Sequence, residues 1–195
     1  MFTNSGQYLG GNNSEAAAFA DIDGDGDADL ILGNRVWLND GGVFADSGQV
    51  LGDGVTETGG VAAVDVDGDG DLDLVFANDG ANRVWLNDGG VFTDSGQALG
   101  NSSTFDLATA DVDGDGDIDL VGANFGQSRV WLNDGGVFTE SAELLDATLS
   151  FAVAAADVND DGLPDLVFAP LFGPTTVWFN NEVPLDGEPG NPIVQ

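Results

Sequence analysis

One acidic ten-residue segment occurs four times in this chain at a nearly constant spacing. The first copy is DIDGDGDADL, and the copies begin at Asp21, Asp65, Asp111 and Asp157, which puts their starts 44, 46 and 46 residues apart. Each is followed by a second segment, RVWLNDGGVF or a variant of it, beginning at Arg35, Arg83, Arg129 and Thr176. Self-similarity with a period of about 20–50 residues is the signature of a repeat architecture, in which each unit packs only against its neighbours.

Each unit contains four short runs that are typical of β-strands. In the second unit these are a small apolar run over residues 60–64, a run apolar on both faces over 74–76, the strand that carries Trp85, and a strand that begins at Val91 after an Asn-Asp-Gly-Gly turn. Strands apolar on both faces are buried on both faces, and Asn, Asp and Gly favour tight hairpins. A four-stranded antiparallel sheet covered on both sides is a propeller blade. The sequence therefore predicts an all-β fold, a β-propeller of four four-stranded antiparallel blades per chain.

The two ends of the chain each carry part of a blade. Residues 2–10 match residues 92–100, a fourth strand, but no first three strands precede them. The last unit has three strands and no recognisable fourth. We therefore expect the N-terminal strand to complete the last blade, because closure removes exposed strand edges. On this basis residues 1–183 form the propeller array, and residues 184–195 form a Pro/Gly-rich tail.

The acidic segments have the ligand spacing of a cation site. Side chains at the first, third, fifth and ninth positions, with a backbone carbonyl at the seventh, can surround one hard cation with oxygen, and Gly at the sixth allows the sharp turn. The side-chain ligands are Asp21, Asp23, Asp25 and Asp29; Asp65, Asp67, Asp69 and Asp73; Asp111, Asp113, Asp115 and Asp119; and Asp157, Asn159, Asp161 and Asp165. The carbonyl comes from Asp27, Asp71, Asp117 or Leu163, and leucine cannot bind through its side chain.

Calcium is the expected ion, with four Ca²⁺ per chain. It takes six to eight oxygen ligands, whereas magnesium keeps several waters and strict octahedral geometry. An EF-hand is excluded because its twelfth position must be Glu, and here it is Leu32, Phe76, Gly122 or Phe168. The alternative is that these segments are solvated acidic turns.

The charge balance excludes several classes of partner and reaction. The chain has 35 acidic residues, three arginines, no lysine and no histidine, for a net charge of −32. Nucleic acid and anionic membranes are therefore not expected as partners, and no apolar run reaches the roughly 20 residues of a membrane span. Without His, Cys or Lys, nucleophilic triads and Schiff bases are excluded. Acids outside the loops, such as Glu57, Glu140 and Glu143, form no evident carboxylate pair, so we expect no enzyme.

Two residue types recur in the third strand of the units. Trp37, Trp85, Trp131 and Trp178 occupy one position, and we expect them to pack between blades rather than stack on sugars. Arg35, Arg83 and Arg129 lie two residues earlier and are expected to pair with acids or to stack on the tryptophans.

The loops and the strands after them resemble the FG-GAP (integrin-α-like, VCBS) repeat family. Its pattern is Asp-x-Asp/Asn-x-Asp-Gly-x-x-Asp followed by Leu-x-Val-Gly-Ala-Pro, and the matching stretches are DVDGDGDIDLVGAN from Asp111 and DVNDDGLPDLVFAP from Asp157. The resemblance covers residues 1–183, although the Phe-Gly part of the pattern is degraded. It implies a calcium-bearing propeller of the kind found, usually with seven or eight blades, in extracellular adhesion, lectin and polysaccharide-active proteins.

This resemblance leads to three functional hypotheses. The first is a non-catalytic, calcium-stabilised binding or adhesion module, secreted or on the cell surface, with glycans as a candidate ligand. The second is a structural or accessory scaffold without its own ligand, and the third is a polysaccharide-active enzyme. The N-terminus has no signal-peptide pattern, so we expect that one was removed or that the chain begins inside a longer protein.

The number of blades also bears on assembly. Four blades that close within one chain must turn by about 90° each, whereas an eight-bladed ring needs about 45°, as in propellers that these repeats resemble. The sequence therefore favours a homodimer that closes one eight-bladed ring with exchanged N-terminal strands. A self-closed four-bladed monomer is the alternative.

Overall fold

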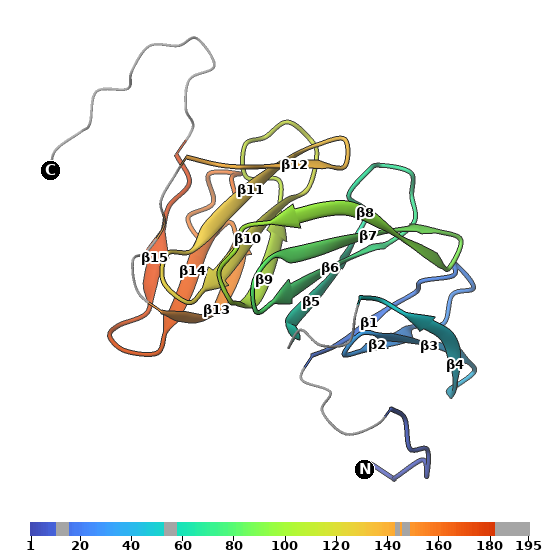
Figure 1. Cartoon of the computed structure of the whole chain (residues 1–195). Coiled ribbons are helices and arrows are strands. Elements are labelled where there is room, and N and C mark those ends of the chain that lie inside the picture. The colour runs from blue at the N-terminus through green and yellow to red at the C-terminus, as the bar shows by residue number, and fades with distance from the viewer. Residues whose placement is uncertain (11–15, 53–57, 143–144, 146–148, 182–195) are drawn as a thin grey trace, which may run out of the picture.

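The computed structural model describes residues 1–10, 16–52, 58–142, 145 and 149–181, and its described part contains strands and no helix (Figure 1). The predicted tail over residues 184–195 lies outside these residues. No helix in the described part has the length and apolar character needed to cross a membrane. The strands are β1 (Ala17–Ala20), β2 (Asp29–Leu32), β3 (Arg35–Asp40), β4 (Val43–Val50), β5 (Thr58–Val64), β6 (Asp73–Asn78), β7 (Asn82–Asp88), β8 (Val91–Leu99), β9 (Thr104–Ala110), β10 (Asp119–Asn124), β11 (Arg129–Asp134), β12 (Val137–Glu140), β13 (Ser150–Ala156), β14 (Asp165–Pro170) and β15 (Thr176–Trp178).

The strands form four antiparallel sheets in chain order, which confirms the predicted blades. Strands β1–β4, β5–β8 and β9–β12 each form a four-stranded sheet, and β13–β15 form a three-stranded one. The register is the same in every blade: the residue after the ninth loop position pairs with the tryptophan of the third strand. These pairs are Leu30 with Trp37, Leu74 with Trp85, Leu120 with Trp131, and Leu166 with Trp178. Figure 1 shows the sheets side by side, with the last blade next to the third.

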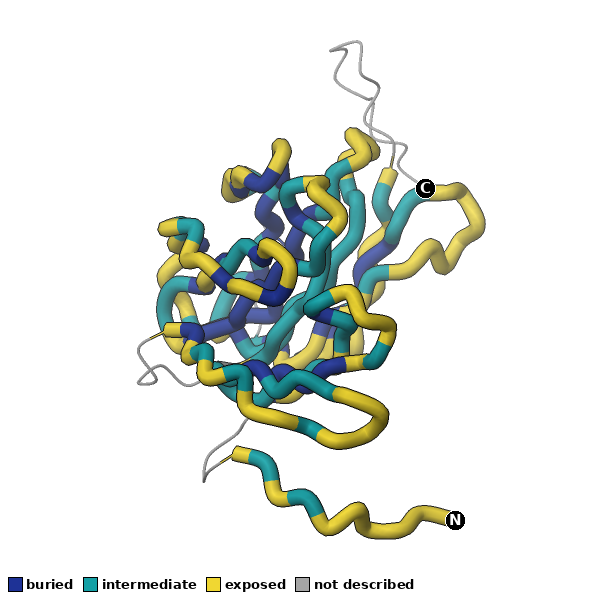
Figure 2. The backbone as a smooth tube through the Cα atoms, turned by 90° about the vertical axis from the view of Figure 1, so that its right-hand side faces the viewer, coloured by how far each residue is buried: buried dark blue, intermediate teal, exposed yellow. Residues whose placement is uncertain are grey.

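The core of the protein lies between the blades. Every residue of the second strands β6 and β10 is buried, as the apolar runs predicted. Three apolar clusters join consecutive blades; the cluster between the second and third blades contains Val66, Trp131 and Phe138. Trp131 therefore packs between blades, as expected. Figure 2 shows that the buried residues gather in the strands, whereas the N-terminal segment is mostly exposed.

The first strands of the blades pack closely against one another. Strand β5 lies against β9, and a Cβ atom added at Gly59 would be 2.5 Å from the Thr104 backbone oxygen and 2.9 Å from the Phe105 Cα. At Gly60 the nearest atom would be 3.4 Å away. Small residues are therefore required where the inner strands converge, which agrees with the alanine- and glycine-rich sequences of these strands.

The array does not close within one chain, as the alternative of a self-closed four-bladed monomer would require. Gln7 donates from Nε2 to the Gly42 carbonyl oxygen (2.8 Å), and its Oε1 accepts the Phe44 N–H (2.9 Å). These contacts hold the N-terminal segment against the first blade, at the opposite end of the array from β15 (Figure 1). The last sheet accordingly has three strands rather than four. Within one chain the segment does not complete the last blade, because its hydrogen bonds attach it to the first.

The close packing of β5 against β9 predicts different costs for two neighbouring glycines. Gly59→Ala should lower the free energy of unfolding by about 1–3 kcal/mol, because its methyl group meets backbone atoms that cannot turn aside. Gly60→Ala, the matched control, should change it by less than about 1 kcal/mol. Denaturant unfolding of the two variants measures the difference. Equal effects would show that the inner strands are farther apart than described.

Candidate metal centres

Each acidic loop connects the first and second strands of its blade and is folded by its own carboxylates. The carboxylate at the first position accepts the N–H of the glycine at the sixth. The four distances are 3.0 Å for Asp21–Gly26, 3.0 Å for Asp65–Gly70, 3.1 Å for Asp111–Gly116 and 2.9 Å for Asp157–Gly162. The third position likewise accepts the N–H of the fifth, and the fifth that of the seventh, in every loop. The four loops therefore share one pattern of internal hydrogen bonds.

The fourth position of the loop requires a left-handed backbone. Gly24 has φ 75°, and Gly68 and Gly114 have similar values. In the last loop this position is Asp160, with φ 61°, and among the described residues it is the one non-glycine with positive φ. Aspartate tolerates this region better than most residues. The last loop thus keeps the common conformation despite its divergent sequence.

The ninth position fastens the loop to two other parts of the blade. Its carboxylate is buried in all four loops, at Asp29, Asp73, Asp119 and Asp165. In the second blade, Asp73 accepts the N–H of Val66 through Oδ2 (2.9 Å) and the N–H of Asn87 through Oδ1 (2.7 Å). The same pair of bonds occurs in the other three blades. The sequence indicated only a metal ligand here, whereas the structure adds a bond to the third strand.

The seventh position faces the hairpin turn of its blade. Asp27 Oδ2 accepts the Gly41 N–H (2.7 Å), and Asp71 and Asp117 make the same bond to Gly89 (2.8 Å) and Gly135 (2.7 Å). The fourth blade lacks the Gly-Gly turn and has Leu163 at this position. The side chain therefore has a partner away from the ligand cluster. This placement supports the prediction that the seventh position offers the ion only its carbonyl.

Three of the loops bring three carboxylates close enough to share one ion. The triads, whose oxygens lie within 4.8 Å of one another, are Asp21, Asp23 and Asp29; Asp65, Asp67 and Asp73; and Asp111, Asp113 and Asp115. Asp25, Asp69 and Asp119 lie outside these triads, and the described residues of the fourth loop, where the third position is Asn159, contain no such triad. Among the described residues, the structure thus brings together nine of the sixteen predicted side-chain ligands.

The donor set fits calcium. All of the gathered side-chain atoms are hard oxygens, which Ca²⁺ prefers. Asp21 Oδ1 is buried and has no hydrogen-bond partner, and such an orphaned carboxylate oxygen is costly unless a cation binds it. A bound calcium would supply positive charge to the gathered carboxylates. The complete coordination sets and the number of four ions per chain stay predictions.

The electrostatics of the loops also favour a cation. Burial raises the pKa of Asp73 and Asp119, although the backbone N–H groups that they accept lower it in part. Burial likewise raises the pKa of Asp23 and Asp113. In the last loop the Gly162 N–H lowers the pKa of Asp157. Negative charge is thus disfavoured at four positions of the first three loops, and a divalent cation would offset this cost.

An asparagine at or just after the end of the third strand links the second, third and fourth blades to the loop of the blade before them. Asn87 Nδ2 donates to the Ile22 carbonyl oxygen (2.9 Å), and Asn133 Nδ2 donates to that of Val66 (2.7 Å). Asn180 makes the equivalent bond to Val112 (2.7 Å). Sequence reasoning treated this asparagine only as part of a turn. The signal was available, because Asn follows the Trp-Leu or Trp-Phe pair in all four units.

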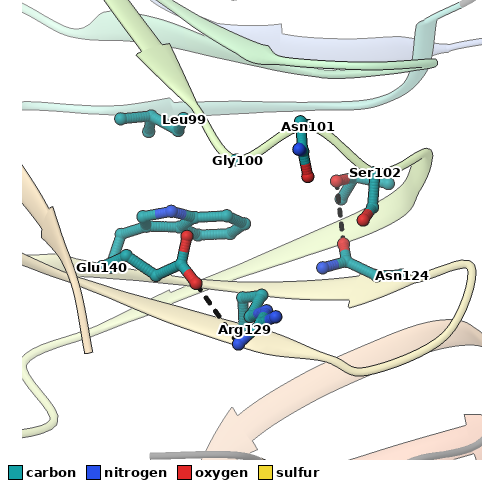
Figure 3. A pocket seen from close by; sticks show the side chains of 9 residues that line it. Leu99, Gly100, Asn101, Ser102, Asn124, Arg129 and Glu140 are labelled. Carbon is teal, nitrogen blue, oxygen red and sulfur yellow. Dashed lines mark hydrogen bonds and ion pairs between the residues drawn. The ribbon is translucent and has the colours of Figure 1, made fainter. Parts of the chain in front are cut away.

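A small polar pocket lies between the second and third blades. It is lined by Asn101 and Ser102, which follow β8, and by Asn124, Arg129 and Glu140 from the third blade (Figure 3). The hollow measures about 270 Å³, part of it open solvent. Arg129 Nη1 is 3.2 Å from Glu140 Oε1, so this arginine pairs within its own blade.

Trp131 lines this pocket but is almost fully buried. A Cβ atom at Gly100 would be 3.1 Å from the Trp131 ring, and the indole is only 2 % exposed. The ring therefore offers no open face for stacking, and recognition in this pocket would depend on its polar groups.

The loop geometry predicts different roles for two aspartates of the second loop. Asp65→Ala should weaken calcium binding at that loop at least tenfold, because it removes a carboxylate of the ligand triad. Asp71→Ala should leave the affinity within a few fold and lower the free energy of unfolding by about 1 kcal/mol, through loss of the bond to Gly89. Calcium titration calorimetry and thermal unfolding separate the two effects. Equal losses of affinity would show that the seventh side chain also binds the ion.

Comparison with known proteins agrees with the repeat geometry. The FG-GAP-like repeat pattern matches three overlapping stretches, residues 33–76, 65–121 and 111–168. No curated protein shows significant similarity to the chain. One similar solved structure concerns recognition of non-reducing terminal N-acetylglucosamine by a lectin from Agrocybe aegerita, with 24% identity and a TM-score of 0.48. The match covers 86% of this chain and 50% of that one, so this chain spans half its length. Because the repeat matches run through most of the sequence, the protein belongs to the FG-GAP-like repeat family.

Proposed function

We propose that the protein is a non-catalytic, calcium-stabilised propeller module that binds glycans outside the cell. The observation that carries this proposal is the acidic loop, repeated four times with the same internal hydrogen bonds and a buried carboxylate at the same place. A loop repeated in this way stabilises the fold, because each copy holds together the strands of its own blade. The loops are thus assigned to stability, and ligand binding is assigned to the surface between blades.

The extracellular part of the proposal rests on the openness of the loops. The carboxylates at the third and fifth positions are exposed or half-buried, so the ions would remain near solvent. Calcium sites of extracellular modules typically have dissociation constants of about 10⁻⁴–10⁻³ M, and they fill only where calcium is abundant. The absence of cysteine from the sequence fits a secreted module in which metal ions replace disulfides as cross-links.

The non-catalytic part rests on the chemistry of the side chains. The sequence has no His, Cys or Lys, and the acids that the structure gathers are engaged in the loops by backbone N–H groups. Carboxylates that serve as a metal cluster and as loop scaffold are poorly suited to act as the separate acid and base that glycoside hydrolysis requires.

The ligand site proposed is the pocket between the second and third blades. Its carboxylate, guanidinium and amide groups can donate and accept hydrogen bonds to sugar hydroxyls. Its cavity volume of about 40 Å³ is far below the roughly 300–1,000 Å³ usual for ligand pockets, so it suits the edge of one sugar residue rather than a long chain.

Two arginines provide a matched test of this site. The Arg35–Asp46 and Arg129–Glu140 pairs are both 3.2 Å long, but only Arg129 lines the pocket. On a glycan array in millimolar calcium, the protein should bind a defined set of sugars. Arg129→Ala should weaken this binding at least tenfold, because hydrogen bonds to charged groups contribute about 1.5–3 kcal/mol. Arg35→Ala should leave it unchanged.

The same experiment separates the competing functions. No binding to any glycan would overturn the lectin role and favour a scaffold without its own ligand. Equal losses in the two variants would place the site elsewhere. Cleavage of an arrayed polysaccharide would show an enzyme.

A further inference from the structure

The surface that joins neighbouring blades is exposed at the end of the array. The second position of each loop lies at this surface: Val66 is 2% exposed under the third blade, whereas Val158, its counterpart in the last blade, is 52% exposed. The third-strand valines that face a following blade show the same contrast: Val84 is 0% and Val130 is 5% exposed, whereas Val177 of the last blade is 51% exposed. The last blade therefore presents the face that the inner blades bury against a following blade.

The first blade presents the opposite face, also without a neighbour. Asn87, Asn133 and Asn180 donate to the second-position carbonyl of the preceding blade. Asn39 Nδ2 donates only to Ala28 of its own blade (2.9 Å), and in the described part of the chain no asparagine side chain donates to the Val158 carbonyl. The Asn39 amide at one end of the array and the Val158 carbonyl at the other thus lack the interblade hydrogen bond that their counterparts make in the described part of the chain.

The hairpin turns give independent evidence for the same missing contact. A Cβ atom at Gly136 would be 2.8 Å from Asp67 Cβ, and one at Gly90 would be 3.1 Å from Asp23 Cβ, because each turn packs against the loop of the preceding blade. At Gly42, the equivalent glycine of the first blade, a Cβ atom would meet nothing within 4 Å. The space that a preceding loop would fill is open.

The N-terminal segment already occupies the place of a preceding blade's fourth strand. Gln49 bonds to Gly90 and Phe92 of the next blade, and Gln97 bonds to Gly136 and Phe138 in the same way. Gln7 makes this pair of bonds to the first blade. The segment therefore lies where the last strand of a blade belongs, with the first three strands of that blade absent. The last blade has those three strands, and among the described strands β15 is the outermost of its sheet.

We propose that two copies of this chain join end to end into one closed ring of eight blades. In this ring the N-terminal segment of each copy pairs with β15 of the other as the fourth strand of its last blade. The register follows the second blade, where Trp85 pairs with Asp94 and Leu86 pairs with Thr93. It places Asn4 opposite Trp178 and Thr3 opposite Phe179 of the other copy.

A second copy fits these ends better than closure of one chain on itself. The segment is held on the first blade, and the first and last blades lie at opposite ends of the array (Figure 1). Closure of four blades would need about 90° per blade, twice the turn of an eight-bladed ring, through the same packed contacts. Two head-to-tail contacts related by a two-fold axis close the ring and give each of its eight blades four strands.

The mass in solution tests the proposal, with one matched pair of variants. By light scattering in calcium, the full chain should have twice its single-chain mass of 19.9 kDa. Val158→Asp should give single chains, because the carboxylate would be buried at the contact. Val91→Asp, a change at an equally exposed valine of an inner blade, should leave two chains. A single-chain mass for the unaltered protein, a mass above two chains, or a Val158→Asp variant that stays paired would overturn the proposal.

A disulfide test identifies the exchanged strand without depending on the strength of association. The chain has no cysteine, so only introduced cysteines can pair. Thr3→Cys with Phe179→Cys should give a covalent two-chain species on a non-reducing gel, because directly opposite residues of paired strands lie within disulfide reach. Asn4→Cys with Phe179→Cys, shifted by one residue to the other face, should not. A disulfide within single chains would overturn the proposal in favour of self-closure.

Discussion

The buried carboxylate at the ninth position of each acidic loop is the interaction on which the rest of the structure depends. In the second blade, Asp73 holds the loop backbone through Val66 and the third strand through Asn87. The same two bonds recur in every blade, so one side chain sets the relation of loop, second strand and third strand four times. Because that carboxylate is removed from water, a cation in the loop would offset the cost of its charge.

The same region also connects the blades to one another. The asparagine whose N–H binds the ninth-position carboxylate reaches across to the preceding loop with its side-chain amide, as Asn133 does to Val66. The turn after it packs on the third loop position, as Gly136 does on Asp67. A change in the conformation of one loop would therefore alter its contacts with the next blade. Loop conformation and blade packing are thus connected through a short chain of contacts, and a bound cation would act on both.

Much of this organisation was predictable because it repeats. The period located the blades, the paired apolar runs identified the buried second strands, and the alternating aspartates indicated a cation loop. The second roles of Asp71 and Asp73 as hydrogen-bond acceptors were not predictable, because they depend on which backbone N–H groups the fold brings near. The contact of Asn87 with the preceding blade was missed for the same reason. The path of the N-terminal segment also needed the structure, since its sequence matches a fourth strand but does not say which blade it contacts.

We propose that cations in the acidic loops hold the blades in shape. A site kept at about 100 times its dissociation constant contributes about 2.7 kcal/mol, so four sites would rival the roughly 5–15 kcal/mol of a whole domain. The most direct measurement is the melting temperature of the chain in calcium and in excess chelator. We expect that removal of calcium lowers the melting temperature by tens of degrees. An unchanged melting curve in chelator would show that cations do not stabilise the blades. The loops would then be acidic turns held only by their own hydrogen bonds.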